Sequence, residues 1–315
     1  MAAHIVIMGA TGFIGSAIVR ELLIQGNRVT VLLRPDSDLA RLSEFEGFAS
    51  ITVSDLLDKE VVNTLKSKNP DIFVNCAWHG VSGNERNNAF QIIYNVPLTI
   101  SSVELAIATG CKQWIGFGSQ AEYGNLNFRI NEESPVRPTT VYGKAKLAAG
   151  IAAMALCEAN GISGVWLRIF STYGPGDAKH WLMPYVIHEL LEGRAPKLTK
   201  CEQVWDYLYV KDLATAVCKV ANGMTNGIFN LGSGMSRPLR DYIDAIYNET
   251  GAALYPEYGV IPYRPDQVMH LEADISRLFA ATGWNPVTTL EDGIYETVAF
   301  ESSNFKGKRT NRFSR

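Results

Sequence analysis

Short apolar runs alternate with helical patterns along the first half of the chain. Six runs are candidate strands: HIVIMG, RVTVLL, SITV, DIFVNCAW, KQWIGFGS and GVWLRIF, at residues 4–9, 28–33, 50–53, 71–78, 112–119 and 164–170. Between them lie helical stretches such as PLTISSVELAIATG, whose last residue, Gly110, is typical of a helix C-terminus. This alternation predicts an α/β fold, a doubly wound parallel sheet with helices on both faces.

Composition limits the kinds of molecule that the chain can form. It has 315 residues, of which 47% are hydrophobic and 19% are charged, enough for a large buried core. The net charge of −3 gives no electrostatic reason to expect a nucleic-acid partner. No charged leader precedes the first apolar run, and no window approaches 18 uninterrupted apolar residues. We therefore expect a cytoplasmic protein without a signal peptide or a membrane segment.

The cysteines give no sign of a disulfide framework or a metal site. The five lie far apart, at positions 76, 111, 157, 201 and 218, and include no C-x-x-C pair. This spacing is typical of small core residues in a reducing compartment. We expect neither a disulfide nor a bound metal.

A glycine-rich turn follows the first apolar run directly. Residues 9–15 read GATGFIG, a G-x-x-G-x-x-G pattern that opens a helical stretch. Glycines let the backbone approach a pyrophosphate, whose charge then faces the unpaired N–H groups of the helix N-terminus. A tight turn without a ligand is the alternative, but the position between a strand and a helix favours a dinucleotide site. Its predicted contacts are Gly9, Thr11, Gly12, Phe13, Ile14 and Gly15.

The ends of the second and third runs bear on which dinucleotide binds. A site for NAD usually places Asp or Glu after the second strand, whereas an arginine there can pair with the 2′-phosphate of NADP. The chain has Arg34 at this point, which favours NADP(H) with NAD possible, although Asp36 and Asp38 lie nearby. Asp55 could reach the adenine edge or could equally cap the helix that begins at LLDKE, and Leu56 is expected among the cofactor contacts.

The rhythm of strands and helices changes after residue 170. Loops rich in Gly and Pro follow, then the apolar run WDYLYV and the β-like GIFNLG. We expect a dinucleotide-binding domain of residues 1–170 completed by about 204–232. A smaller, mixed α/β substrate lobe would comprise about 171–203 and 233–302, and residues 303–315 would form a flexible basic tail.

A tyrosine and a lysine are the first candidates for chemistry. VYGKAK, residues 141–146, places Tyr142 and Lys146 four positions apart in a helical stretch, and hence on one helix face. A phenol titrates at about pH 10, but a neighbouring ammonium lowers its pKa, which suits proton transfer to a carbonyl. The alternative is a surface Tyr–Lys pair. The glycine-rich turn and Ser119, at the end of the fifth run, favour the catalytic interpretation.

In this order, the motifs resemble those of the extended short-chain dehydrogenase/reductases, in the branch that modifies nucleotide sugars. The resemblance runs from about residue 4 to 300 and includes GATGFIG, GSQAEYG, YGKAK, LRIFSTYGPGD, WDYLYVKDLA, YRPD and ATGWNP. It implies that Ser119, Tyr142 and Lys146 form a catalytic triad.

The resemblance also implies further contacts around the cofactor. Asn95 matches an active-site asparagine of the family, and its other interpretation is an N-cap of the helix that follows. Ala77 and Phe170 are implied at the cofactor as well.

The two positions after Ser119 exclude some of the chemistry of the family. In its 4,6-dehydratases the triad hydroxyl is followed directly by Asp and Glu, and in its 3,5-epimerase/reductases a cysteine stands two places after the serine. Here these positions are Gln120 and Ala121, and neither side chain exchanges a proton at neutral pH. Dehydration and carbanion-type epimerisation therefore lack a base at this location. Hydride transfer with a tyrosine relay remains.

The nucleotide-sugar end of the site is also assigned by resemblance. Arg264 in YRPDQ matches a pyrophosphate-binding arginine, whereas Trp205 stands where the family usually has a second arginine, and would stack on a base or simply pack. Ser171 occupies a position where some sugar epimerases carry asparagine. The predicted substrate contacts are Gln120, Ser171 and Arg264; Lys179, His180, Trp78 and His79 could line the mouth of the site.

Two reactions need only the tyrosine relay, namely reduction of a 4-keto sugar and 4-epimerisation with tightly held NAD. Because Arg34 favours NADPH, we expect a reductase of the 4-keto group of a nucleoside-diphosphate 4-keto-6-deoxyhexose, with Tyr142 as proton donor. The alternatives are a nucleotide-sugar 4-epimerase and, in a different class, a non-catalytic NADP-sensing regulator. KLAAGIAAMALCEANG, after Tyr142, is apolar nearly all round, so we also expect a homodimer that covers one face of this helix.

Overall fold

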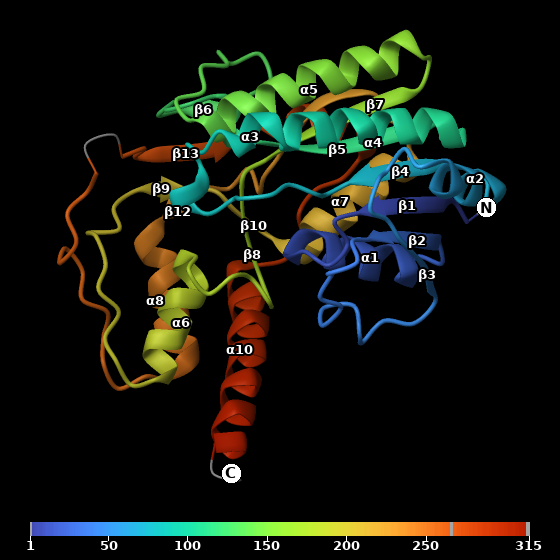
Figure 1. Ribbon diagram of the computed structural model, residues 1–315. Helices are drawn as coiled ribbons and strands as arrows, with labels where there is room; N and C mark the ends of the chain where they lie inside the picture. Colours follow the sequence, from blue (N-terminus) through green and yellow to red (C-terminus); the bar gives the residue numbers. More distant parts are fainter. Residues whose placement is uncertain (1, 265–266, 313–315) are drawn as a thin grey trace.

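A parallel sheet forms the larger part of the protein. The structure is a computed structural model that describes residues 2–264 and 267–312. In this part of the chain seven parallel strands pair in the order β11-β7-β5-β4-β1-β2-β3 (Figure 1). Their bounds are β1 His4–Met8, β2 Arg28–Leu33, β3 Phe48–Thr52, β4 Ile72–Asn75, β5 Gln113–Ser119, β7 Ser163–Ile169 and β11 Gly227–Leu231.

The central strands are apolar on both faces because helices cover both. Along β1, Ile5 and Ile7 pack into one hydrophobic cluster, whereas Val6 and Met8 pack into another on the opposite face. Helices α1 (Phe13–Ile24) and α7 (Val210–Asn222) lie together on the first face. Helices α2 (Lys59–Ser67), α4 (Asn95–Thr109) and α5 (Val141–Ala159) cover the second (Figure 1). The predicted doubly wound fold is confirmed.

The predicted strands and the observed ones differ mainly at their ends. All six predicted runs contain a strand, and β3 starts two residues before SITV. Helix α4 ends at Gly110 in a left-handed C-cap with φ of 83°, as its sequence predicts. The late run GIFNLG forms β11, which pairs with β7 and closes that edge of the sheet.

The second half of the chain builds a lobe with its own core. Buried side chains of α6 (Leu182–Leu191), α8 (Leu239–Thr250) and α10 (Leu290–Arg312) form a third hydrophobic cluster. Figure 1 shows these three helices beside the sheet domain. Short elements connect the two parts: β6 Arg129–Ile130, β8 Ser171–Tyr173, β9 Val204–Trp205, β10 Tyr207–Tyr209, β12 Arg237–Pro238, β13 His270–Ala273 and α9 Ser276–Thr282.

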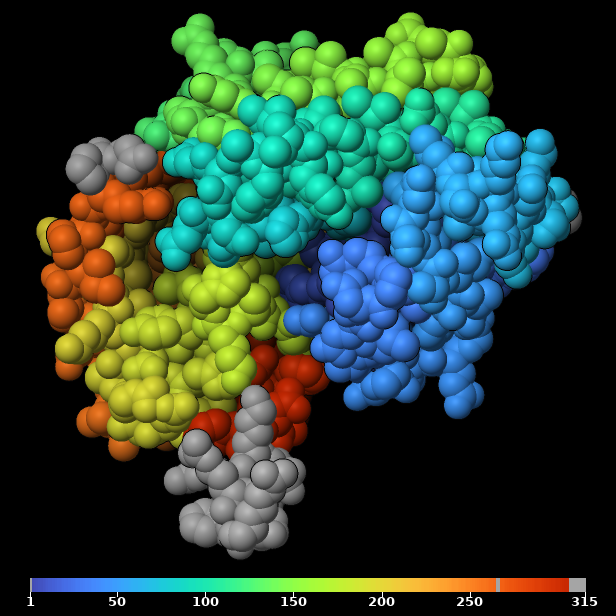
Figure 2. All heavy atoms as spheres, in the orientation of Figure 1, coloured from blue at the N-terminus to red at the C-terminus, as the bar shows by residue number. Residues whose placement is uncertain are grey.

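Between the two parts the surface is hollowed. In Figure 2 the depression lies where the blue N-terminal region, the yellow-green region around α6 and the cyan region around α4 meet. Dark-blue atoms of the N-terminal segment are visible at its floor. The exact domain boundaries stay a prediction. Helix α10 continues without a break to Arg312, so most of the predicted tail is helical, and residues 313–315 lie outside the described residues.

One apolar stretch is long enough to cross a membrane by length and composition. It runs from Phe90 to Thr109 and comprises the short α3 (Phe90–Ile93) and α4. In the structure it packs against β4, β5 and α5, so its apolar residues have a place within the fold. That the protein has no membrane segment stays a prediction.

Candidate active site

The glycine-rich turn is packed tightly against the end of β4. Gly9 has φ of 82°, and a Cβ on it would lie 2.6 Å from the backbone N of Ala77. A Cβ on Gly15 would lie 2.1 Å from the carbonyl oxygen of Gly9. Side chains at these two positions would therefore separate the turn from the strand or from the helix that follows.

Gly12 differs from these two glycines, because packing leaves space for a side chain there. This free space is relevant to whether a dinucleotide fits. A Cβ there would meet a single atom within 4 Å, the carbonyl oxygen of Gly9 at 3.4 Å, so packing does not require glycine. Gly12 is the N-cap of α1, and no side chain of the described residues caps that helix. The N–H groups of its first turn, which starts with Phe13 and Ile14, are thus left for an anion. These residues fit a pyrophosphate.

The residues predicted at the adenosine end lie at the carboxyl edge of the sheet. Arg34 follows β2 and is largely exposed, with a 3.4 Å contact between its Nε and Asp36 Oδ1 that is open to solvent. Asp55 is exposed after β3, and Leu56 packs against the core cluster beneath α2. The N-cap of α2 is Asp58, whose Oδ1 accepts a hydrogen bond from the N–H of the second helical residue at 2.8 Å. The alternative that Asp55 caps this helix is therefore wrong.

Ser119 is held at the end of β5 by a buried carboxylate. It caps the short helix η2 (Gln120–Glu122), its Oγ accepting from the Ala121 N–H, while its own N–H donates to Glu122 Oε1 at 2.9 Å. Glu122 is fully buried and also accepts from Arg168 Nε at 2.8 Å and from Trp166 Nε1 at 3.0 Å. The serine therefore projects from a rigid turn.

The approach of α5 brings the tyrosine to the serine. Gly143, next to Tyr142, has no room for a side chain, because a Cβ would lie 2.4 Å from the carbonyl oxygen of Ala121. This contact allows the first turn of α5 to pack on η2. Tyr142 is 7% exposed and its phenol hydrogen-bonds Ser119, so two of the three predicted triad residues meet.

The electrostatic environment of Tyr142 differs from the sequence-based expectation. Burial raises the pKa of the phenol, and the hydrogen bond from Ser119 and the charge of Arg86 oppose this effect. The guanidinium carbon of Arg86 lies 5.2 Å from the centre of the tyrosine ring. The expectation that Lys146 lowers this pKa is therefore not met here. Burial lowers the pKa of the lysine itself to about 7, against the raising effect of Glu122 and Cys76.

Lys146 completes the predicted triad but is held by other groups. Its Nζ donates to the carbonyl oxygen of Phe117 at 2.6 Å and lies 3.8 Å from the centre of the Trp78 ring. The distance from Nζ to the centre of the Tyr142 ring is 5.9 Å. Trp78 also contacts Tyr142 edge to face, with the ring centres 6.0 Å apart. Trp78 thus contacts two of the three triad residues, Lys146 and Tyr142, in addition to any place at the mouth of the site.

Asn95 holds the loop that carries Trp78. Its side chain accepts from the His79 N–H at 2.8 Å and donates to the His79 carbonyl oxygen at 2.9 Å. The N-cap of α4 is Tyr94, so the alternative that Asn95 is an N-cap is wrong. The fully buried Gln91 accepts from the Trp78 indole N–H at 2.8 Å. These amides fix the loop after β4 beside the triad.

The three predicted substrate contacts lie on separate segments of the chain. Gln120 lies in η2 next to Ser119, and the Ser171 hydroxyl, at the start of β8, accepts from the Trp205 indole N–H at 2.7 Å. Trp205 therefore packs, and it contacts the hydrophobic clusters of both the sheet domain and the lobe. Arg264 is exposed, and the next two residues of its motif lie outside the described residues. Phe170 is buried, with its ring 6.5 Å from that of Tyr123, centre to centre.

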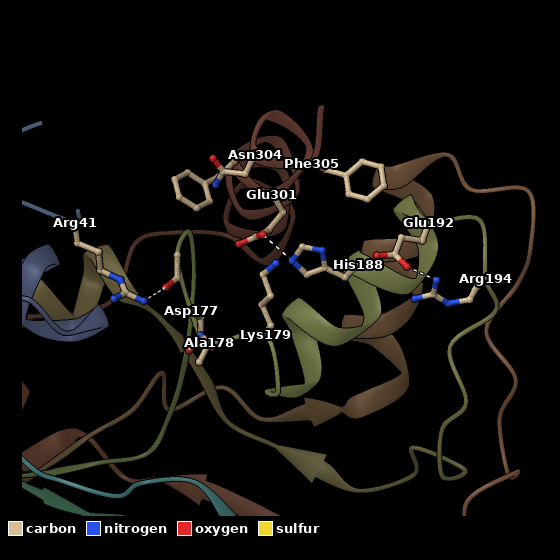
Figure 3. Close-up of a pocket in the computed structure, with 12 residues that line it drawn as sticks. Arg41, Asp177, Ala178, Lys179, His188, Glu192, Arg194, Glu301, Asn304 and Phe305 are labelled. Carbon is tan, nitrogen blue, oxygen red and sulfur yellow. Dashed lines mark hydrogen bonds and ion pairs between the residues drawn. The ribbon is translucent and has the colours of Figure 1, made fainter. Parts of the chain in front are cut away.

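A separate hollow of about 940 Å³ lies between α6, α10 and the loop after β8 (Figure 3). Lys179 points into this hollow, toward Glu301 and His188. The distance between Glu301 Oε2 and His188 Nε2 is 2.9 Å. Arg41 closes one side by donating to the Gly176 carbonyl oxygen at 3.0 Å. Burial raises the pKa of Asp177, on its wall, to about 7, against the Ala178 N–H and the Arg41 charge. The triad residues do not line this hollow.

Three residues of the site were missed by the sequence reasoning. Glu122 has a signal that could have found it, since Ser119 and Glu122 form the S-x-x-E pattern of a capping box. Gln91 and Arg86 have no comparable signal, because only the folding of the segment between β4 and α4 brings Gln91 to the Trp78 indole and Arg86 to the Tyr142 ring.

The cysteines form no disulfide in this structure. The five cysteines are free, and four of them are buried. Within the described residues no three His, Cys, Asp or Glu side chains are grouped as a metal ion would require.

Comparisons with known proteins place this geometry in a family. Residues 5–232 match the sequence model of the NAD dependent epimerase/dehydratase family. The chain is 28% identical to a dTDP-6-deoxy-L-talose 4-dehydrogenase (NAD(P)(+)) of Kitasatospora kifunensis, over 96% of each chain. It also resembles a solved UDP-N-acetylglucosamine 4-epimerase from Methanobrevibacter ruminantium M1 in complex with UDP-N-acetylmuramic acid. That likeness has a TM-score of 0.87 and 26% identity over 96% of this chain and 100% of the other.

A further solved relative contains a nicotinamide dinucleotide. It is a UDP-glucose 4-epimerase of Thermus thermophilus in complex with NAD, 25% identical, with a TM-score of 0.78 over 94% of this chain and 98% of the other. The residues that fit a pyrophosphate, the Ser–Tyr–Lys cluster and these matches all agree. The chain belongs to the NAD dependent epimerase/dehydratase family, within the extended short-chain dehydrogenase/reductases, a family of NAD(P)-dependent enzymes that modify nucleotide sugars.

Proposed function

We propose that this protein is a 4-ketoreductase, which uses NADPH to reduce the 4-keto group of a nucleoside-diphosphate 4-keto-6-deoxyhexose. The observation that carries the proposal is the Ser119–Tyr142 pair at the buried end of β5, followed by two residues without an acid or a base. Such a site can donate a proton to a ketone oxygen but cannot remove one from a sugar carbon. A relative named for 4-dehydrogenation of a 6-deoxy sugar supports it, since 4-ketoreduction is the reverse reaction.

Each residue of the triad has a distinct task in this proposal. Ser119 and Tyr142 hydrogen-bond the ketone oxygen, and Tyr142 supplies the proton as negative charge develops there. Lys146, which donates to the Phe117 carbonyl oxygen in this structure, would hold the ribose of the cofactor. The bound nicotinamide dinucleotide would supply the hydride. Burial of the triad excludes water from the reacting atoms.

The preference for NADPH is part of the proposal and depends on Arg34. Its side chain is 64% exposed at the carboxyl end of β2, where the 2′-phosphate of the dinucleotide would lie, and its contact with Asp36 is weak. Replacing Arg34 by aspartate should lower the affinity for NADPH more than that for NADH. Equal losses for the two cofactors would remove the basis for this preference.

Nucleotide-sugar 4-epimerisation is the second candidate, because two of the solved relatives described above are named 4-epimerases. The same three residues could serve it, with the cofactor retained and returned to its starting state. The absence of a base after Ser119 excludes neither reaction.

We also propose that the protein works as a cytoplasmic homodimer. Ile92, Ile93 and Tyr94, around the start of α4, and Ile151 of α5 leave large apolar side chains exposed on the outer side of the helix layer. Helices α4 and α5 lie side by side there (Figure 1). A second copy packed on this layer would cover these residues.

Product analysis separates the candidates. Purified protein is incubated with NADPH that carries deuterium at the transferable position and with a panel of nucleoside-diphosphate 4-keto-6-deoxyhexoses. The proposal predicts cofactor oxidation and a product with deuterium at the sugar C4. Interconversion of a nucleotide hexose and its C4 epimer without net cofactor oxidation would identify the epimerase instead. Tight NADPH binding without any turnover would favour a sensor.

A further inference from the structure

The loop between β4 and α3 is fastened to the start of the catalytic helix. The carbonyl oxygen of Arg86 accepts the N–H of Tyr142 at 2.8 Å. The side-chain oxygen of Asn87 accepts the N–H of Val141 at 3.1 Å. These two bonds satisfy donors of the first turn of α5, which has no earlier turn to pair with. The position of Arg86 relative to Tyr142 is therefore fixed through the backbone.

The guanidinium of Arg86 lies against the tyrosine, and no carboxylate of the described residues forms an ion pair with it. Its central carbon is 5.2 Å from the centre of the Tyr142 ring. Its Nε is buried and has no hydrogen-bond acceptor among the described residues. The neighbouring carboxylate, Glu85, is bonded to the hydroxyl of Ser82 instead. A full positive charge is thus retained next to the phenol.

The other charged or hydrogen-bonding groups that face Tyr142 come from three elements. Ser119, at the end of β5, hydrogen-bonds the phenol, and Glu122 of η2 acts on it with a negative charge. Lys146, on α5 itself, is 5.9 Å from the ring centre, but burial lowers its pKa to about 7. The lysine is therefore only partly charged near neutrality, whereas an arginine stays charged throughout the working range.

We propose that Arg86 is an additional member of the proton relay, the permanent cation that stabilises the Tyr142 phenolate formed when this residue gives up its proton. This role rests on the proposed function, in which Tyr142 is the proton donor. Arg86 does not touch the reacting atoms; it acts through Tyr142, whose phenolate its charge stabilises. Its task is to offset both the burial of the phenol and the charge of Glu122.

The pH dependence of turnover tests this role directly. During reduction Tyr142 must be protonated, so kcat/KM falls as pH rises through the pKa of the phenol. Arg86→Gln removes the stabilising charge and should move this falling limb to higher pH by about one unit, with a lower kcat at neutral pH. Arg86→Lys should keep the limb near its wild-type position. Arg28→Gln, at the amino end of β2, serves as the charge-removal control and should leave the limb unmoved.

A readout without substrate keeps this inference separate from the proposed function. In protein labelled at the tyrosine Cζ, the Tyr142 NMR signal is identified by its loss in Tyr142→Phe, and its titration is followed with and without Arg86→Gln. A shift of this titration to higher pH supports the role of Arg86 even if no ketoreductase activity is found. An unmoved titration, or a rise in KM with an unmoved pH limb, would overturn it, because Arg86 would then bind substrate or support the fold alone.

Discussion

At the residue scale, the site depends on a buried acid that does no chemistry. Glu122 is bonded to the Ser119 N–H, to Arg168 and to Trp166, and it has no exposed surface. The ion pair with Arg168 is buried on both sides, with side-chain exposures of 0% and 6%. Removing one partner of such a pair leaves an uncompensated charge in the core.

Glu122→Gln should therefore lower the free energy of unfolding by about 3–5 kcal/mol. Chemical denaturation measures the change. The matched control is Glu133→Gln, because the Glu133 side chain is 85% exposed and its 3.2 Å contact with Arg277 is open to solvent. That variant should lose less than about 1 kcal/mol. Similar losses of unfolding free energy in both variants would mean that burial does not make the Glu122–Arg168 pair more important for stability than an exposed pair.

The buried Lys146 makes stability depend on pH in a defined direction. Its ordinary pKa is 10.5, and burial lowers the folded value to about 7. Between these values the unfolded chain holds a proton that the folded chain has released, so stability rises with pH; below the folded value both states are charged. Relative to Lys146→Met, the wild-type free energy of unfolding should rise above about pH 7, by at most about 1.4 kcal/mol per pH unit. A constant or falling difference would contradict this.

At the element scale, the close approach of α5 to η2 depends on glycine at position 143, which has no side chain. Gly143→Ala would place a Cβ 2.4 Å from the Ala121 carbonyl oxygen, so the helix must move away from Ser119. We expect a loss of about 1–3 kcal/mol in stability in spite of the better helix propensity of alanine. kcat should fall as well, because Tyr142 moves with the helix. Gly83→Ala is the control, since a Cβ there meets nothing within 4 Å.

The helices and strands were predictable where the sequence pattern involves residues that are close together in the chain. The apolar runs, the glycine-rich turn and the four-residue spacing of Tyr142 and Lys146 depend on near neighbours in the chain, and the strands and helices follow them. The surroundings of the triad were not predictable. Arg86 and Trp78 reach it from a loop whose path depends on bonds to distant residues, such as the Tyr142 N–H.

Two interpretations failed because the sequence pattern did not contain the deciding feature. Asp55 and Asp58 are both good N-caps, and only the start of α2 at Lys59 decides between them. The pKa of Tyr142 depends on burial and on Arg86, neither of which the Tyr–Lys spacing contains.

At the scale of the whole molecule, the outer helix layer has an exposed apolar surface. Ile151 of α5 is 64% exposed, and Ile93, just before α4, is 73% exposed. If a second copy covers this surface, Ile151→Glu should convert the dimer to a monomer, as measured by analytical ultracentrifugation. Val287→Glu, on a residue that is 83% exposed after α9, should leave the mass unchanged. A wild-type monomer at every concentration tested would refute the proposed dimer.

At the scale of the whole molecule, the proposed reaction depends on one phenol, that of Tyr142 at the start of α5. The most direct test compares wild type with Tyr142→Phe in the NADPH-dependent reduction of a nucleoside-diphosphate 4-keto-6-deoxyhexose, with NADPH affinity measured in parallel. The account predicts a fall in kcat of about 10²–10⁴-fold with unchanged NADPH affinity. A phenylalanine variant that reduces the ketone at the wild-type rate would contradict it.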